Sequence, residues 1–101
     1  MASRAELQKE LETLLGSRNV YYQSPETVKM EYPAIRYTKS DIDTKFANDK
    51  AYLHKKKYEI TVIDRKPDNP VIDKILSMPM STFNRYYPAE NLHHDVITLY
   101  Y

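Results

Sequence analysis

Tyr58-Glu59-Ile60-Thr61-Val62-Ile63-Asp64 is the stretch with the clearest strand pattern in this chain of 101 residues. Tyr58, Ile60 and Val62 occupy every second position, which places them on one face of an extended backbone. β-branched and aromatic residues of this kind are favoured in strands. The pattern predicts the longest strand of the chain, over residues 52–64.

Shorter strand patterns precede this stretch. Val20-Tyr21-Tyr22 is typical of a short strand. Apolar residues alternate with charged ones over residues 28–32 and again over residues 35–37, with Pro33 between the two runs. Because proline cannot donate a ladder hydrogen bond, Pro33 indicates a sheet edge or a bulge.

Residues 39–50 are polar and contain two turn-forming pairs, Ser40-Asp41 and Asn48-Asp49. We therefore expect a long connection between strands. Connections of this length in a compact domain are usually functional or disordered. This segment is a candidate for contacting another protein.

A helix is predicted at the N-terminal end, from residue 2 or 3 to residue 15. Ser3 followed by Glu6 matches a capping box. Gly16 stands where a left-handed helix end favours glycine. The expected apolar face consists of Leu7, Leu11, Leu14 and Leu15.

A second helix is predicted after a turn over residues 64–69. Asn69 is suited to cap it, and Pro70 is suited to its first position, where a missing N–H costs nothing. Pro79 is expected to end it. Its apolar face is expected to contain Val71, Ile72, Ile75, Leu76 and Met78.

Two further strands are predicted at the C-terminal end, over residues 82–87 and 96–101. They are expected to pair as a hairpin joined by residues 88–95. The chain has ten tyrosines, and this end is rich in them. Tyrosine suits both strands and surfaces that become buried on assembly, so composition alone leaves both interpretations open.

The expected order is helix, three strands, helix, two strands. That order favours an α+β fold in one domain over residues 1–101, a mostly antiparallel sheet with two helices packed on it as a second layer. A domain of this size buries only about 60–65% of the surface of its unfolded chain. Its core is thin, and partner surfaces are a further way to bury apolar groups.

Composition excludes several classes of protein. The formal net charge is +1 with interspersed signs, which disfavours a dedicated nucleic-acid-binding domain. There is no cysteine for a disulfide or a thiolate site. No apolar run approaches the roughly 20 residues of a membrane span, and the first residues lack the apolar core of a signal peptide. We expect a soluble protein that is made in the cytoplasm and has no membrane partner.

No group of residues indicates catalysis. His93 and Asp95 could share a face of a strand and bind a metal ion with His54, but the spacing matches no zinc pattern. The alternative is that Asp95 caps a turn. The pair Asp41 and Asp43 is more typical of solvated loop carboxylates than of acid–base catalysis. No serine lies in a nucleophile motif, and one glycine cannot build a phosphate loop. We expect no enzyme activity, no cofactor and no metal.

Lys55-Lys56-Lys57 allows two interpretations. In a strand Lys55 and Lys57 point one way and Lys56 the other, so they do not form one basic patch. Lysines that protect a sheet edge are favoured over a nucleic-acid contact.

Taken in order, several segments resemble the tail terminator family of tailed bacteriophages, small proteins that close the tail tube and meet the head connector. The similarity extends over nearly the whole chain. Its segments are Tyr32-Pro33-Ala34-Ile35-Arg36-Tyr37, Ala47-Asn48-Asp49-Lys50-Ala51-Tyr52, residues 58–64, Pro67-Asp68-Asn69-Pro70, Arg85-Tyr86-Tyr87-Pro88-Ala89-Glu90-Asn91-Leu92-His93-His94-Asp95, and Leu99-Tyr100-Tyr101.

The resemblance implies a structural virion protein that forms a ring, expected to be hexameric. Such a ring caps the tail tube, ends tail polymerisation and joins the tail to the head connector. The implied partners are further copies of the chain, the tail tube protein and a head-completion or connector protein. DNA would pass through the ring without sequence-specific binding. Assembly would take place in the cytoplasm of the host bacterium, and the protein would reside in the virion tail or neck.

Ten residues are the candidates for subunit contacts, drawn from the polar segment and from the tyrosine-rich end. They are Asp41, Asp43, Phe46, Asn48, Asp49, Tyr52, Arg85, Tyr86, Tyr87 and His93. Two other classes of function remain open. One is another phage neck, minor tail or head-completion adaptor, or a tube subunit, and the other is a small regulatory domain that binds one protein.

Overall fold

A computed structural model describes residues 4–23, 31–47 and 50–101, with the backbone alone for residues 41–47 and 50–55. It confirms the expected α+β class and the order of its elements. The elements are α1 (Arg4–Leu15), β1 (Val20–Tyr22), β2 (Ala34–Ala47), β3 (Lys50–Asp64), α2 (Val71–Leu76), β4 (Ser81–Ala89) and β5 (Leu92–Tyr100).

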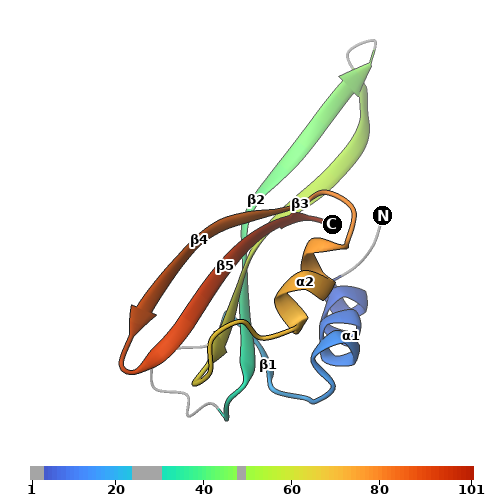
Figure 1. Cartoon of the computed structure of the whole chain (residues 1–101). Coiled ribbons are helices and arrows are strands. Elements are labelled where there is room, and N and C mark those ends of the chain that lie inside the picture. The colour runs from blue at the N-terminus through green and yellow to red at the C-terminus, as the bar shows by residue number, and fades with distance from the viewer. Residues whose placement is uncertain (1–3, 24–30, 48–49) are drawn as a thin grey trace.

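The strands form one sheet in the order β1-β2-β3-β5-β4, with β3 at its centre. β1 runs parallel to β2, whereas the other neighbouring strands are antiparallel. Both helices lie against the same face of the sheet, which gives two layers (Figure 1). The other face, called the open face below, carries no helix of the described chain (Figure 1).

The core lies between the helices and the middle of the sheet, and it follows from the alternation in β3. Tyr58, Ile60 and Val62 are buried together on the helix-facing side. The neighbouring strands contribute residues at matching register positions, such as Tyr37 opposite Ile60. The buried cluster consists of Leu7, Leu11, Val20, Ile35, Tyr37, Tyr58, Ile60, Val62, Val71, Ile75, Ile97 and Leu99.

Two of the ten tyrosines, Tyr37 and Tyr58, are core residues. Their ring centroids lie 5.9 Å apart, and the hydroxyl of Tyr37 donates a hydrogen bond of 2.5 Å to Gln8. Burial raises the pKa of both phenols. At these two positions, tyrosine is therefore a strand residue that fills the core, and it is not part of an exposed contact surface.

The first helix follows its predicted pattern. Leu7 and Leu11 are buried, and Leu14 and Leu15 pack against the core. Gly16 adopts φ +82 and its N–H bonds the carbonyl of Glu12 at 2.9 Å, which confirms the predicted helix end. Ser3 of the expected capping box lies outside the described residues.

The second helix is also capped as predicted. The side-chain oxygen of Asn69 accepts a 2.9 Å hydrogen bond from the N–H of Val71, and Pro70 already has helical φ −58 and ψ −22. Asp64 at the end of β3 accepts a 2.7 Å hydrogen bond from the Asn69 amide, which ties the cap to the sheet. Val71 and Ile75 are buried.

The expected connection over residues 39–50 is wrong. β2 continues to Ala47 and β3 begins at Lys50, and the two strands remain paired from Ala34↔Ile63 to Ala47↔Lys50. Each strand supplies the other's backbone hydrogen bonds, so a polar sequence can be extended without a core face. We call residues 41–47 and 50–56 the arm. It extends away from the two-layer body and contributes to overall extents of 51 × 22 × 22 Å (Figure 1).

The strand expected over residues 28–32 is not observed where the structure describes it. Residues 31–33 are not in a strand, and β2 begins at Ala34 after Pro33. Residues 28–30 lie outside the described part of the chain. Pro33 therefore precedes a strand and does not interrupt one, because its fixed φ and missing N–H are harmless before the ladder begins.

The expected link between the last two strands, residues 88–95, is too long. The turn consists of Glu90 and Asn91, both with positive φ, 53 and 63. Two-residue turns of this kind match the twist of a hairpin, and asparagine tolerates the left-handed region. Pro88 fits in β4 because β4 is an edge strand. His93 and Asp95 are therefore strand residues, and Asp95 does not cap a turn.

Tyr101 is tied to the body after β5 ends. Its N–H and carbonyl form hydrogen bonds with the backbone of Lys56, and its hydroxyl donates a 2.9 Å hydrogen bond to Glu10. Its ring packs against the core. Burial and the bond to Glu10 raise the pKa of Tyr101 to about 12.

Deleting Tyr100 and Tyr101 should lower the free energy of unfolding by about 1–3 kcal/mol, because apolar area and hydrogen bonds to α1 and β3 are lost. Urea denaturation followed by circular dichroism measures this. The control is Tyr101→Phe, which keeps the ring and should cost less than about 1 kcal/mol. A truncated protein as stable as the full chain would show that these residues are not part of the folded body.

Candidate functional site

β4 is a nine-residue strand at the edge of the sheet. Every residue from Thr82 to Pro88 is exposed, in contrast to β3 and β5. The exposed residues include large apolar ones. Phe83 is 44% exposed, Tyr86 47% and Tyr87 37%, and Met80 just before the strand is 54% exposed. Such residues on an edge are the most conspicuous apolar surface of the described chain.

The exposed aromatic rings lie on both faces of the sheet. Phe83 is opposite Ile97 and Tyr86 is opposite Asp95, so both lie on the helix-facing side with the core residue Ile97. Tyr87 is opposite His94 and lies on the open face. A bulge at Asn84 produces this change of pattern by placing one extra residue in β4.

Ring contacts with β5 hold the aromatic side chains of β4. Tyr87 stacks on His94 with centroids 4.6 Å apart and an interplanar angle of 10°, and the Arg85 guanidinium lies 5.6 Å from the Tyr87 ring. Tyr86 stacks on His93 at 5.8 Å, and its hydroxyl lies 2.5 Å from Nδ1 of His93. Side chains ordered in this way lose little entropy when a partner binds. We call Met80, Phe83, Arg85, Tyr86 and Tyr87 the β4 edge surface.

Asp95 is opposite Tyr86 in the ladder, and the charges of Asp68, His93 and His94 act on its carboxyl group. Burial, and secondarily the charge of Asp68, raise the pKa of Asp95, while His93 and His94 act in the opposite direction. Among the described residues, no three or more His, Cys, Asp or Glu side chains are grouped so that they could hold a metal ion. The side chain of His54, which the sequence offered as a third candidate ligand, lies outside the described part of the chain.

A shallow depression of about 160 Å³ lies on the open face. It is lined by Arg36, Thr38, Glu59 and Thr61. These residues come from β2 and β3, away from β4, and they provide no nucleophile with an activating base. In the described chain, no helix is both long and apolar enough to cross a membrane.

The structure divides the ten predicted contact residues between two places. Arg85, Tyr86, Tyr87 and His93 come together on the β4–β5 hairpin. Asp41, Asp43, Phe46 and Tyr52 lie on the arm, where the backbone alone is described, and Asn48 and Asp49 lie outside the described residues. The arm and the turn of the β4–β5 hairpin project from opposite ends of the molecule (Figure 1).

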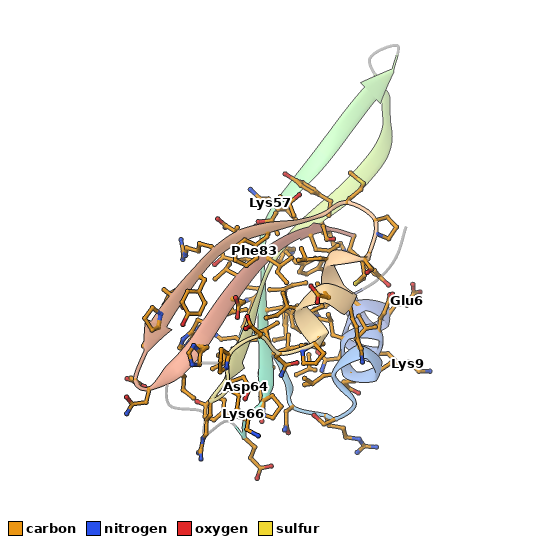
Figure 2. All side chains as sticks on the ribbon, in the orientation of Figure 1. Glu6, Lys9, Lys57, Asp64, Lys66 and Phe83 are labelled. Atoms are coloured by element: carbon orange, nitrogen blue, oxygen red, sulfur yellow. The ribbon has the colours of Figure 1, made fainter. Side chains whose placement is uncertain are left out.

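Sequence reasoning missed Phe83 and Met80 as surface residues. Phe83 was expected to lie in a strand, and its exposure follows from the position of β4 at the sheet edge. Figure 2 labels Phe83 on β4, among the side chains of the β4–β5 hairpin. Phe83, Tyr86 and Tyr87 do not follow one alternation, so a regular strand cannot bury all three on one face. The irregular spacing of these three aromatic residues is the sequence feature that could have indicated their exposure.

The lysine triplet lies in β3, as its strand interpretation requires, but β3 is the central strand of the sheet, so Lys56 and Lys57 do not protect an edge. Lys57 is opposite Asp41 in β2 and Tyr100 in β5, while Lys56 exchanges backbone hydrogen bonds with Tyr101. Beyond this point β3 continues into the arm. The lysines therefore mark the place where the arm leaves the body.

Asp95→Asn should stabilise the fold more at pH 7 than at pH 3. The raised pKa means that the folded state disfavours the charged carboxylate. Below the pKa of the unfolded state, Asp95 is protonated in both states, and its full contribution to stability is present. That contribution is lost as the pH rises through the folded-state pKa, because the carboxylate then becomes charged in its partly buried position. Urea denaturation of both proteins at the two pH values measures the difference. Asp73→Asn, at an exposed position on α2, is the control; an equal effect of Asp95→Asn at both pH values would contradict the argument.

The chain matches no protein-family model, and comparison with curated proteins and with solved structures gives no match. The arm and the β4 edge surface are therefore the features of the described chain that bear on its function.

Proposed function

We propose that this chain is a non-catalytic assembly protein of a tailed bacteriophage tail. In this proposal, copies of the chain form a closed ring, hexameric in the family that it resembles. The ring caps the tail tube, ends its polymerisation and offers a surface to the head connector. The observation that supports it most is the β4 edge surface, an exposed edge strand with aromatic residues on both faces.

An exposed edge of this kind favours a protein-binding role. A long edge strand with apolar side chains is a template for pairing with another chain, and proteins usually shorten, charge or cover such edges. β4 has one charged residue, Arg85, and one proline, Pro88. Tyrosine, phenylalanine, methionine and arginine are the residues enriched at protein interfaces. The β4 edge surface consists of these four types.

A ring needs two different surfaces on each subunit. In a head-to-tail contact, one surface of each copy binds a different surface of the next copy. Such contacts form a closed ring when the rotation between successive copies returns to the first copy. The arm and the turn of the β4–β5 hairpin project from opposite ends of the molecule, and the β4 edge surface runs along one edge of the sheet between them (Figure 1). This arrangement suits a head-to-tail contact better than a two-fold one.

The remaining partners follow from the same proposal. One side of the ring would contact the tail tube protein and the other a head-completion or connector protein, within the virion. The net charge of +1 suits a ring through which DNA passes without sequence-specific binding. No residue is assigned to catalysis.

The proposal is tested by the oligomeric state of the purified chain. Light scattering after size-exclusion chromatography, followed by negative-stain microscopy, should show closed rings, either alone or after tail tubes of the same virus are added. Filaments would indicate a tube subunit. A monomer that stays monomeric with tubes and binds one other protein would indicate a small regulatory domain, and would overturn the proposal.

Phe83→Asp with Tyr86→Asp should abolish ring formation, because two charges would be placed on a surface that is desolvated in the ring. Phe83 is 44% and Tyr86 47% exposed, so the variant should remain folded, with a melting temperature lowered by no more than roughly 10 °C. The matched control is Lys9→Asp with Thr13→Asp on the exposed side of α1, which should still form rings. Rings that persist in the β4 variant would show that the β4 edge surface is not the subunit contact.

A further inference from the structure

The outer edge of β4 lacks a partner strand in the described chain. β4 pairs with β5 on one side, and it ends the sheet order β1-β2-β3-β5-β4 on the other. The seven residues from Ser81 to Tyr87, which include the bulge at Asn84 and precede Pro88, are long enough for a ladder with a further strand. The backbone groups that point outward from such an edge are free to bond another chain.

The distribution of the aromatic residues favours strand addition over docking on a face. Phe83 and Tyr86 lie on the helix-facing side, and Tyr87 lies on the open face. A partner on one face would leave the other side exposed. A strand added beside β4 places its own side chains next to these rings on both faces, as cross-strand neighbours.

The arm is a part of the described chain whose strands have unpaired outer edges. β1 pairs with β2 only over Ile35–Tyr37, and β5 pairs with β3 only over Lys57–Asp64. In the described backbone, the outer edges of residues 41–47 and 50–55 therefore have no ladder partner, whereas Lys56 bonds Tyr101. The arm strands also contain no proline that would block pairing.

Charge selects one edge of the arm. Residues 41–47 contain two aspartates and one lysine, whereas residues 50–56 contain three lysines and no acid. The charged residue of β4 is Arg85. Opposite charges on adjacent strands stabilise pairing and like charges oppose it. The β2 edge of the arm is therefore the better complement of β4.

We propose that residues 41–47 of one copy add to the outer edge of β4 of the next copy, so that the sheet continues from subunit to subunit. This inference rests on the proposed ring, and it names the two surfaces that meet. A strand from the arm joined to β4 is a heterologous contact, because neither surface pairs with itself. Repeated around the ring, it covers every β4 edge.

The absence of cysteine from the chain allows a direct test. Thr44→Cys in the arm and Asn84→Cys in β4 are made as separate proteins, mixed under the conditions that give rings, and oxidised. A disulfide requires Cα atoms within about 7 Å, so it reports direct adjacency. Lys9→Cys on α1 replaces Asn84→Cys in the control mixture. Melting curves of each variant show that it is folded.

The expected result is a mixed Thr44→Cys/Asn84→Cys disulfide, formed roughly tenfold or more faster than in the control mixture, because assembly raises the effective concentration of the two thiols. Rings that form no disulfide with Thr44→Cys, whether the second cysteine stands at Asn84 or, to cover the other registers, at Thr82 or Tyr86, would overturn the arm-to-β4 contact and leave the ring intact. A disulfide between two Asn84→Cys chains in its place would indicate a two-fold β4 contact and also overturn it. The mixed disulfide in open chains without rings would support the contact and count against the proposed function.

Discussion

The pairing of β3 with strands on both of its sides is the constraint on which the rest of the structure depends. β2 and β5 bring Ile35, Tyr37, Ile97 and Leu99 beside the alternating residues of β3. The resulting apolar face is broad enough to hold α1 and α2. Because the side-chain period of a strand is two, a slip of one residue would turn this entire face toward solvent. The register of β3 thus determines where the helices pack and which face stays open.

The same constraint explains why the protein has so much exposed apolar surface. α1 has 12 residues and α2 has six, and together they cover the middle of the sheet. Nothing in the described chain remains to cover β4 at one edge or the arm beyond β1 and β5. A small domain has a large surface relative to its volume, so its apolar residues at the periphery are buried most readily by another chain. In the proposed ring, these surfaces would be buried against neighbouring copies of the chain.

The candidate site could be predicted in part from the sequence. The cluster of Arg85, Tyr86 and Tyr87 was identifiable because arginine and tyrosine are typical of interfaces. Phe83 was not, since a phenylalanine in a strand is more often a core residue, and its exposure depends on β4 being the last strand of the sheet. His93 lies close to Tyr86 because the turn at Glu90 and Asn91 is shorter than the sequence indicated. The position of a strand within a sheet depends on long-range pairing, which local patterns do not contain.

The sequence by itself determined the elements whose signals are local. These are the leucine face and glycine end of α1, the Asn69-Pro70 start of α2, and the alternation of β3. Only the tertiary structure decided the arm, the parallel pairing of β1 and the edge position of β4. In the arm, residues 41–47 and 50–56 are extended because the two strands satisfy each other's backbone groups, from Ala47↔Lys50 to Ile42↔Lys56. Their polar composition and turn-forming residues indicate a loop, and only the pairing of the two strands makes them a ladder. Local chemistry fixes the period of a segment, whereas its neighbours fix whether it becomes core, edge or arm.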